Sequence, residues 1–319
     1  MKIKELWNKI RKGVKAGMAA ATESNVLTDN RVVSMIEKFK ASGKYKLMQE
    51  GERYYQADND IKNRKITRKV DGHKEEETWR ANNKLAHAKY KIQVDEKIAY
   101  LLTKPVTYKT DGTDKNDTYV EKVKDVLGKH FQYQLTQLGY EASNKGIGWL
   151  HVYLDPEGEL KTIVIPAEQC IPYWSDRSHT ELDAMIRVYN TTVWQYNQEK
   201  EITNVEIWTK DGVKYYRLEG QMLVYDNDKS MDAGGPVAHY KSVEEWKTWG
   251  KVPFIPFKNN QIEMPDVKFV KSLIDGYDLG RSEAANYMDE VKNLIFVLKG
   301  YGGQNLSDFI KQLNEDRAI

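Results

Sequence analysis

The sequence predicts an α+β fold in which helices come first, a mainly antiparallel β region follows, and a long helix comes near the end. Residues 2–143 place apolar side chains at helical spacing, whereas residues 144–257 carry short β runs separated by turns. Residues 266–292 contain no proline and keep one amphipathic pattern over roughly 37 Å of helix. Strands and helices do not alternate, so a parallel α/β sheet is not expected.

The composition excludes several classes of protein. The chain of 319 residues carries 49 Lys and Arg against 47 Asp and Glu, so it lacks the global basic signature of a nucleic-acid binder. It has no signal peptide and no apolar run of about 18 residues, so we expect no membrane partner. Its single cysteine, Cys170, excludes an intrachain disulfide and favours a reducing compartment. These features predict a soluble intracellular protein.

The first third of the chain is predicted to be helical. Residues 2–18 form a basic amphipathic helix that we expect to dock on a partner rather than to lie on a membrane. Residues 29–41 and 44–57 follow as two helices, broken at Ser42 and Gly43. The segment 62–69 then gathers five basic residues after a pair of tyrosines. Such a segment is either a solvated loop or a contact for phosphates and stacked bases.

Two further helices and a β region are predicted next. Residues 71–78 form a polar loop, residues 77–102 a long helix, residues 106–108 a short strand and residues 117–143 another helix. The predicted strands are 146–154, 160–165, 170–174, 184–189, 205–209, 213–218 and 221–225, with an extended segment at 253–257. The turns 155–158 and 210–212 predict hairpins.

The long helix after Pro265 and Asp266 has two different faces. Its apolar positions are Val270, Leu273, Ile274, Tyr277, Ala284, Met288, Val291 and Ile295, and its polar positions are Asp275, Asp278, Ser282, Asn286 and Asp289. Gly276, Gly280 and Ala284 recur four residues apart along the edge of the apolar face. Each mid-helix glycine costs about 1 kcal/mol, so these small residues mark either a tolerated bend or a contact with a neighbouring helix.

No motif predicts an enzyme, a cofactor or a metal site. The six histidines lie in six separate elements, and none has metal-ligand spacing to another histidine or to Cys170. The loop 300–303 follows a predicted strand, at 294–298, but lacks the Lys-Ser/Thr of a phosphate loop. The acidic residues show no pattern typical of two-metal phosphoryl chemistry. A metal-dependent nucleic-acid-processing enzyme therefore stays the weakest alternative.

Several stretches together resemble the portal proteins of tailed bacteriophages, most closely those of long-tailed phages that infect Gram-positive hosts. They are RYYQADNDIKNR, NNKLAHAKYKIQVDEKIAYLLTKPVTY, IPAEQCIPYW, PFIPFKNN and SLIDGYDLGRSEAANYMDEVKNLIFVLKGYG, in the family's order over most of residues 45–315. The resemblance implies the portal fold, with a wing (1–262, helical to 143 and β-rich over 144–262), a first stem helix (263–293) and a partial clip (294–319). It also implies that the second stem helix, the tunnel loop and the crown are absent.

The resemblance implies a function without catalysis. A portal subunit forms a ring of about twelve copies at one capsid vertex of the virion, assembled in the host cytoplasm, through which double-stranded DNA is packaged and ejected. The implied partners are other copies of the chain, the major capsid and scaffolding proteins, the terminase and a head-completion or adaptor protein. The last two would dock on the clip, where the candidate contacts are Lys299, Tyr301, Phe309 and Lys311.

This resemblance implies a possible function for the acidic face of the long helix. Asp275, Asp278 and Asp289 would line a DNA channel and repel phosphates, or would simply face solvent. The alternative function is a monomeric DNA-binding adaptor that uses the basic segment 62–69.

Overall fold

The computed structural model describes residues 27–70, 72–109, 118–195, 198–230, 235–242 and 245–294, together with Asp308 and Lys311. The chain forms two compact units: one combines Met1–Ser42 with Gln169–Pro253, and the other combines Gly43–Glu168 with Phe254–Ile319. Every strand pair that the structure describes is antiparallel, and helices accompany both larger sheets. The predicted α+β class is therefore confirmed.

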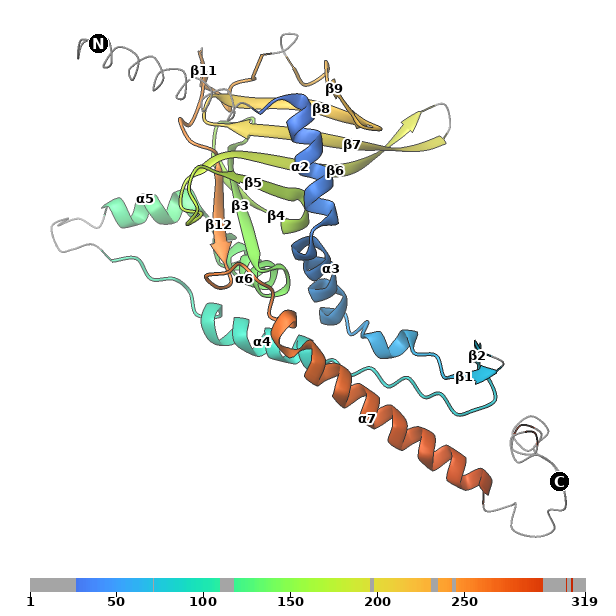
Figure 1. The fold of residues 1–319 in the computed structure, drawn as a ribbon. Coiled ribbons are helices and arrows are strands. Elements are labelled where there is room, and N and C mark those ends of the chain that lie inside the picture. The colour runs from blue at the N-terminus through green and yellow to red at the C-terminus, as the bar shows by residue number, and fades with distance from the viewer. Residues whose placement is uncertain are drawn as a thin grey trace, which may run out of the picture. The chain divides into compact units, whose positions relative to one another are not determined.

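The first unit is built on a five-stranded sheet in the order β5-β6-β7-β8-β9. The strands are β5 (Cys170–Trp174), β6 (Leu182–Gln195), β7 (Gln198–Thr209), β8 (Gly212–Glu219) and β9 (Met222–Tyr225). Helix α2 (Asp29–Ala41) lies on one face of this sheet (Figure 1), where its Val32 and Ile36 pack against Ile186 and Val205. A small hairpin of β10 (Tyr240–Ser242) and β11 (Glu245–Lys247) belongs to the same unit.

The second unit contains the smaller sheet, in the order β12-β3-β4. Its strands are β3 (Ile147–Leu154), β4 (Leu160–Ile165) and β12 (Phe254–Lys258), and the 3-10 turn η2 (Ala167–Gln169) follows β4. Its first four helices are α3 (Gly43–Tyr55), α4 (Lys89–Leu102), α5 (Thr118–Leu127) and α6 (Phe131–Lys145). The alternating apolar positions of β3 and β4 bury Trp149 completely and Ile165 almost completely.

The longest element of the second unit is α7 (Val267–Leu294), a helix of 28 residues. It starts directly after Asp266, as predicted. The 3-10 helix η1 (Asp60–Asn63) and an extended segment that leads into α4 run beside α7, and a hairpin of β1 (Thr67–Val70) and β2 (His73–Glu76) connects these two segments (Figure 1). We call residues 79–88 of this extended segment the strap.

The structure corrects four expectations about local structure. Residues 77–88 are extended rather than helical, because the polar groups of the strap bond to α7 instead of to one another. The helix predicted over 117–143 is two helices, since Gly128 takes the left-handed conformation at φ +71 between them. Part of the predicted polar loop 71–78 is strand β2, and residues 106–108 form no strand. The helix predicted over 2–18 and the strand predicted over 294–298 lie essentially outside the described residues.

Candidate functional site

The base of α7 is fixed by a partly buried network around Asp266. The carboxylate of Asp266 accepts hydrogen bonds from Lys97 Nζ at 2.7 Å, from Ser143 Oγ at 2.6 Å and from Asn259 Nδ2 at 2.8 Å. The backbone N–H of Asp266 also donates to the carbonyl of Ser143 at 2.9 Å. Although burial opposes ionisation of this carboxyl, its hydrogen bonds outweigh that effect and lower the pKa of Asp266. The first turn of α7 is thereby tied to α4 and α6.

This network makes the stability of the second unit depend on pH. Because the folded pKa of Asp266 lies below its ordinary value of 3.8, its stabilising contribution is complete above that pH and is lost as the pH falls further. We expect Asp266→Asn to cost about 1–2 kcal/mol at neutral pH and to flatten the dependence of unfolding free energy on pH in the acid range. Urea unfolding at neutral and acid pH measures the loss of stability and its dependence on pH. Asp125→Asn, at an exposed position, is the control. An unchanged acid dependence would contradict the assignment.

Above its base, α7 buries an apolar stripe and then a charged cluster. Val267 and Ile274 pack against Tyr54, Tyr90, Val94 and Ile98 from α3 and α4. Next to Ile274, the partly exposed Asp275 accepts hydrogen bonds from the Tyr54 hydroxyl and from Lys271, which also pairs with Asp60. Burial, together with the bond to Asp275, raises the pKa of Tyr54 to about 12. Tyr54 therefore stays a neutral hydrogen-bond donor at physiological pH.

The upper half of the same side of α7 buries polar residues instead of apolar ones. Asp278 and Ser282 are completely buried, and Asn286 is nearly so. Each accepts a hydrogen bond from a backbone N–H of the strap: Asp278 from His87 at 3.2 Å, Ser282 from Leu85 at 3.0 Å and Asn286 from Asn83 at 2.6 Å. Asp278 also accepts from the side chain of Asn59, and His87 Nδ1 lies 2.9 Å from its Oδ1. These three side chains satisfy backbone donors that no strand partner reaches.

The strap and α7 fit together because the repeat distance along the extended strap is almost the same as the repeat distance along the helix. Two residues of extended chain advance about 6.6 Å, and four residues of α-helix advance about 6 Å. The strap runs antiparallel to α7, so every second strap residue from Asn83 to His87 meets every fourth helix position from Asn286 to Asp278. Two ion pairs lie beside this row of hydrogen bonds. They join Arg64 to Glu283 and, at 3.2 Å, Arg80 to Glu290.

The strap corrects the prediction for the acidic face. Asp278 faces neither solvent nor a channel, because it is buried under the strap of its own chain. Asp275 is partly buried and bonds to Tyr54 and Lys271, whereas Asp289 is exposed and accepts a hydrogen bond from Asn83 Nδ2 at 2.9 Å. A channel-facing role for Asp275 and Asp289 stays a prediction. The segment 79–88 was missed because its alanines and Leu85 fit a helical pattern, whereas its contacts with α7 are made by the backbone N–H groups of Asn83, Leu85 and His87, which leave no signal in the sequence.

The opposite side of α7, which we call the uncovered face, is apolar and exposed. It carries Phe269, Leu273, Tyr287 and Met288, of which Leu273 is 73% exposed and Tyr287 is 69% exposed, while Tyr277 at its edge contacts His87 and Lys89 of the same chain. At Gly276 and Gly280 an added Cβ would meet no atom within 4 Å. Ala284 lies on the same stripe and is exposed. The predicted helix contact at these three small residues therefore has no partner among the described residues of this chain, and it stays a prediction.

The basic segment 62–69 is largely neutralised by the chain's own carboxylates. Lys62 pairs with Asp58 at 3.6 Å, Lys65 with Glu76 at 3.0 Å, and Arg64 with Glu283. Arg68 lies 3.9 Å from carboxylate oxygens of both Glu75 and Glu77. A phosphate backbone would have to compete with these pairs, so the geometry gives no support to a DNA-binding adaptor that uses this segment.

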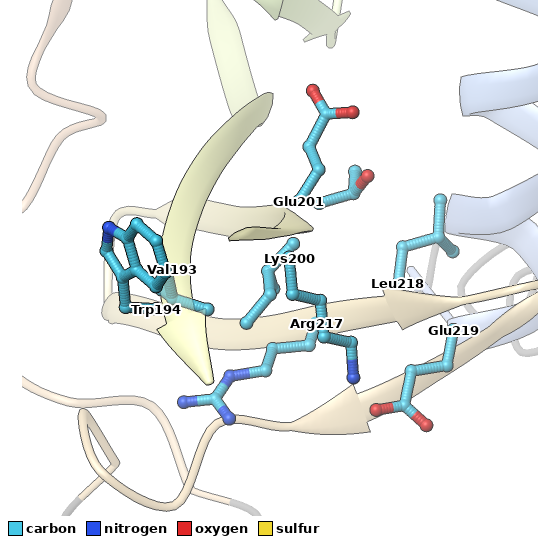
Figure 2. A pocket seen from close by; sticks show the side chains of 9 residues that line it. Val193, Trp194, Lys200, Glu201, Arg217, Leu218 and Glu219 are labelled. Carbon is cyan, nitrogen blue, oxygen red and sulfur yellow. The ribbon is translucent and has the colours of Figure 1, made fainter. Parts of the chain in front are cut away.

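One hollow lies in the first unit, beside the long hairpin of β6 and β7. It encloses about 660 Å³ where β8 ends and the hairpin continues alone. Figure 2 shows Val193 and Trp194 on one side of it and Leu218 and Glu219 on the other. Its Arg217 already pairs with Asp226 at 2.8 Å and with Asp228 at 2.9 Å. The hollow follows from the unequal strand lengths and gathers no nucleophile with a base.

Other chemical features are few in the described part of the chain. There, no three side chains of His, Cys, Asp or Glu lie together so as to hold a metal ion. None of the described helices combines the length and apolar character needed to cross a membrane. Cys170 is buried in β5. Of the candidate clip contacts, Lys311 is helical and exposed, and Lys299, Tyr301 and Phe309 lie outside the described residues.

Comparison with known proteins identifies the family. Residues 40–319 match the model of the family described as "Phage portal protein, SPP1 Gp6-like". The chain is 32% identical over 288 residues to the portal protein of Bacillus phage SPP1, which covers 90% of this chain and 55% of that protein. It is also 32% identical over 276 residues to the portal protein of Clostridium phage phiCD119, covering 83% of this chain and 57% of that protein. The chain thus spans little more than half the length of these relatives, and it belongs to the phage portal protein family.

Proposed function

We propose that this chain is a subunit of a ring at one vertex of a phage capsid, through which double-stranded DNA is packaged and later ejected. Membership of the portal family supports this function. The observation that carries it is the inverted amphipathicity of α7, whose polar side is buried by its own chain while its apolar side is left uncovered. A surface helix of a monomer normally does the reverse.

The uncovered face has the character of an interface between protein chains. Its large side chains extend from Phe269 to Met288, along roughly 29 Å of helix. Contiguous exposed apolar surface of this kind marks an interaction site. The strap holds the polar side of α7 inward with three backbone donors and the ion pair of Arg80 with Glu290, and Arg64 adds a second ion pair with Glu283. We infer that another copy of the chain covers the face.

The remaining parts of the proposal follow from the family. The ring would contain about twelve copies, meet the major capsid and scaffolding proteins through the wing, and reside in the virion after assembly in the host cytoplasm. The terminase and then a head-completion or adaptor protein would dock on residues 294–319, with Lys299, Tyr301, Phe309 and Lys311 as contacts. DNA would pass without sequence-specific contacts, and the subunit would have no catalytic activity, cofactor or metal of its own.

Electron microscopy and sedimentation of the purified chain test the proposal. We expect rings with a central hole. Leu273→Asp should reduce assembly at least about tenfold, because it buries an unpaired carboxylate at the centre of the interface. Met222→Asp, in β9, is the matched control, since Met222 is 69% exposed and belongs to the first unit, whereas α7 belongs to the second. Monodisperse monomers of the unmodified chain, or equal effects of the two substitutions, would count against the proposal.

A further inference from the structure

The hairpin of β6 and β7 extends beyond the rest of its sheet. Strand β6 pairs with β7 along all of Gln198–Thr209, whereas β8 pairs with β7 only from Thr203 to Thr209. Residues 198–202 of β7 therefore have a strand on one side and, among the described residues, none on the other. We call this stretch the open edge. The hollow of about 660 Å³ lies beside it, where a continuation of β8 would run (Figure 2).

The register of the sheet decides which backbone groups of the open edge lack a strand partner. Thr209 and Gly212 flank a two-residue turn, so they form a hydrogen-bonded pair, and every second pair along the ladder does the same as far as Thr203. By the same count, Glu201 and Glu199 point their N–H and C=O groups to the side on which β8 has already ended. A strand placed there would exchange hydrogen bonds with both residues.

The side chains of the open edge alternate in charge. Glu199, Lys200 and Glu201 are all exposed, and Glu201 Oε1 accepts a hydrogen bond from Asn190 Nδ2 at 2.8 Å, which orients its carboxylate. Charged side chains of this kind protect a strand edge that stays exposed in the free protein. They favour a strand that a partner protein adds reversibly over one that the same chain supplies permanently.

The same charges oppose a second copy of the chain as the partner. When two edges pair antiparallel, a residue whose backbone points outward lies opposite another such residue. In the open edge these residues are Glu199 and Glu201, so each register that joins two open edges sets glutamate directly opposite glutamate. Like charges in directly opposed positions destabilise a strand pair. The partner must therefore carry the opposite charge at these positions.

We propose that the open edge binds an extended segment of a partner protein in which basic residues lie two positions apart, as in Lys-Glu-Lys. Each lysine lies opposite Glu199 or Glu201, and the glutamate between them lies opposite Lys200. The backbone hydrogen bonds of the added strand supply affinity, and the side-chain pairs supply specificity. This site belongs to the first unit and does not depend on the proposed ring.

Peptides of opposite charge pattern test the site on the full chain. The probe is fluorescein-labelled Thr-Lys-Glu-Lys-Val-Thr, and the control peptide is Thr-Glu-Lys-Glu-Val-Thr with the same label. We expect fluorescence anisotropy to show saturable binding of the probe and at least about fivefold weaker binding of the control peptide. Glu199→Lys combined with Lys200→Glu and Glu201→Lys should reverse this preference. Glu121→Lys combined with Lys122→Glu, exposed on α5, is the matched control and should not change it.

Three results of the binding experiment would overturn the proposal. They are no saturable binding of the probe up to about 1 mM, equal affinities of the two peptides, and a preference that the triple variant does not reverse. The proposed function is tested separately. If the chain binds the probe but forms no ring, only the proposed function fails; if it forms rings but does not bind the probe, only the strand addition is wrong.

Amide hydrogen exchange gives a second, independent result. Without peptide, the N–H groups of Glu199 and Glu201 should exchange rapidly, and the probe should protect both. N-methylation of the two lysines removes the donors that face the open edge and should abolish this protection, whereas N-methylation of the central glutamate, whose N–H points away, should preserve it. Slow exchange without peptide would mean that the chain or a second copy already covers the edge, and binding without protection would mean that charge alone attracts the probe. Either result would refute strand addition.

Discussion

Replacing Asp278 by alanine is expected to lower the free energy of unfolding by about 2–4 kcal/mol. The carboxylate of Asp278 is completely buried and serves three donors, the side chain of Asn59 and the backbone N–H and ring nitrogen of His87. Alanine removes this acceptor from the buried Asn59 amide, which keeps only the His87 carbonyl, and from the partly buried backbone N–H and ring of His87. The substitution should also loosen the strap, because Asp278 lies at the point where the strap passes into α4.

Urea unfolding and amide hydrogen exchange measure the two effects separately. The backbone N–H groups of Asn83, Leu85 and His87 should lose protection in Asp278→Ala, and the sheet β12-β3-β4 should keep its protection. Asp289→Ala is the matched control, since this exposed aspartate on the same helix accepts one hydrogen bond from Asn83. We expect the control to change stability by less than about 0.5 kcal/mol. Equal losses from the two substitutions would refute the role given to Asp278.

Elements whose signals are local were predictable from the sequence. The hairpin of β3 and β4 follows from alternating apolar residues around the turn at 155–158, and the break between α2 and α3 follows from Ser42 and Gly43. The long helix α7 was predicted nearly to the residue, because Pro265 and Asp266 mark its start and no proline interrupts it. In each case the determining residues lie within one element or at its ends.

The strap was not predictable in this way because its partners are distant in sequence. Asn83 and Asn286 are separated by 203 residues, yet the hydrogen bond between them decides that residues 79–88 are extended. Intrinsic propensity favours a helix through Ala81, Leu85 and Ala86, and this preference is weak enough for tertiary contacts to override it. Every second residue of the strap meets every fourth residue of α7, and this match is visible only when both segments are considered together.

The candidate site shows a second limit of sequence reasoning. Periodicity identifies two faces of a helix, but it does not say which face the chain itself will cover. In α7 the usual assignment is reversed beyond Ile274: Asp278, Ser282 and Asn286 are buried, while Tyr287 and Met288 are exposed. Backbone donors of the strap satisfy an acceptor on each of these three side chains, which offsets much of the cost of burying them, although Asn286 Nδ2 is buried without a partner among the described residues. The apolar face is then left exposed in the described part of the chain, and a contact with another copy there stays a proposal.

Gly146 holds the junction from which α7 departs, and its substitution is expected to have a large effect. It ends α6 in the left-handed conformation at φ 88, its N–H donates to the carbonyl of Ala142 at 2.7 Å, and its own carbonyl accepts from the N–H of Asn259 at 3.1 Å. A Cβ at this position would lie 2.3 Å from the carbonyl oxygen of Glu263. Both the backbone conformation and the close approach therefore require glycine.

We expect Gly146→Ala to destabilise the second unit by about 2–5 kcal/mol, from left-handed strain and from displacement of the turn that contains Glu263. Gly158→Ala separates the two causes, because Gly158 has a similar φ of 83 but an added Cβ would meet nothing within 4 Å. This control should cost only about 1–2 kcal/mol. Thermal unfolding and the yield of ring-sized assemblies measure the consequences. If α7 is oriented through this junction, Gly146→Ala should lose assembly more steeply than Gly158→Ala; equal stability and equal assembly of the two variants would show that the close approach at Gly146 does not hold the helix.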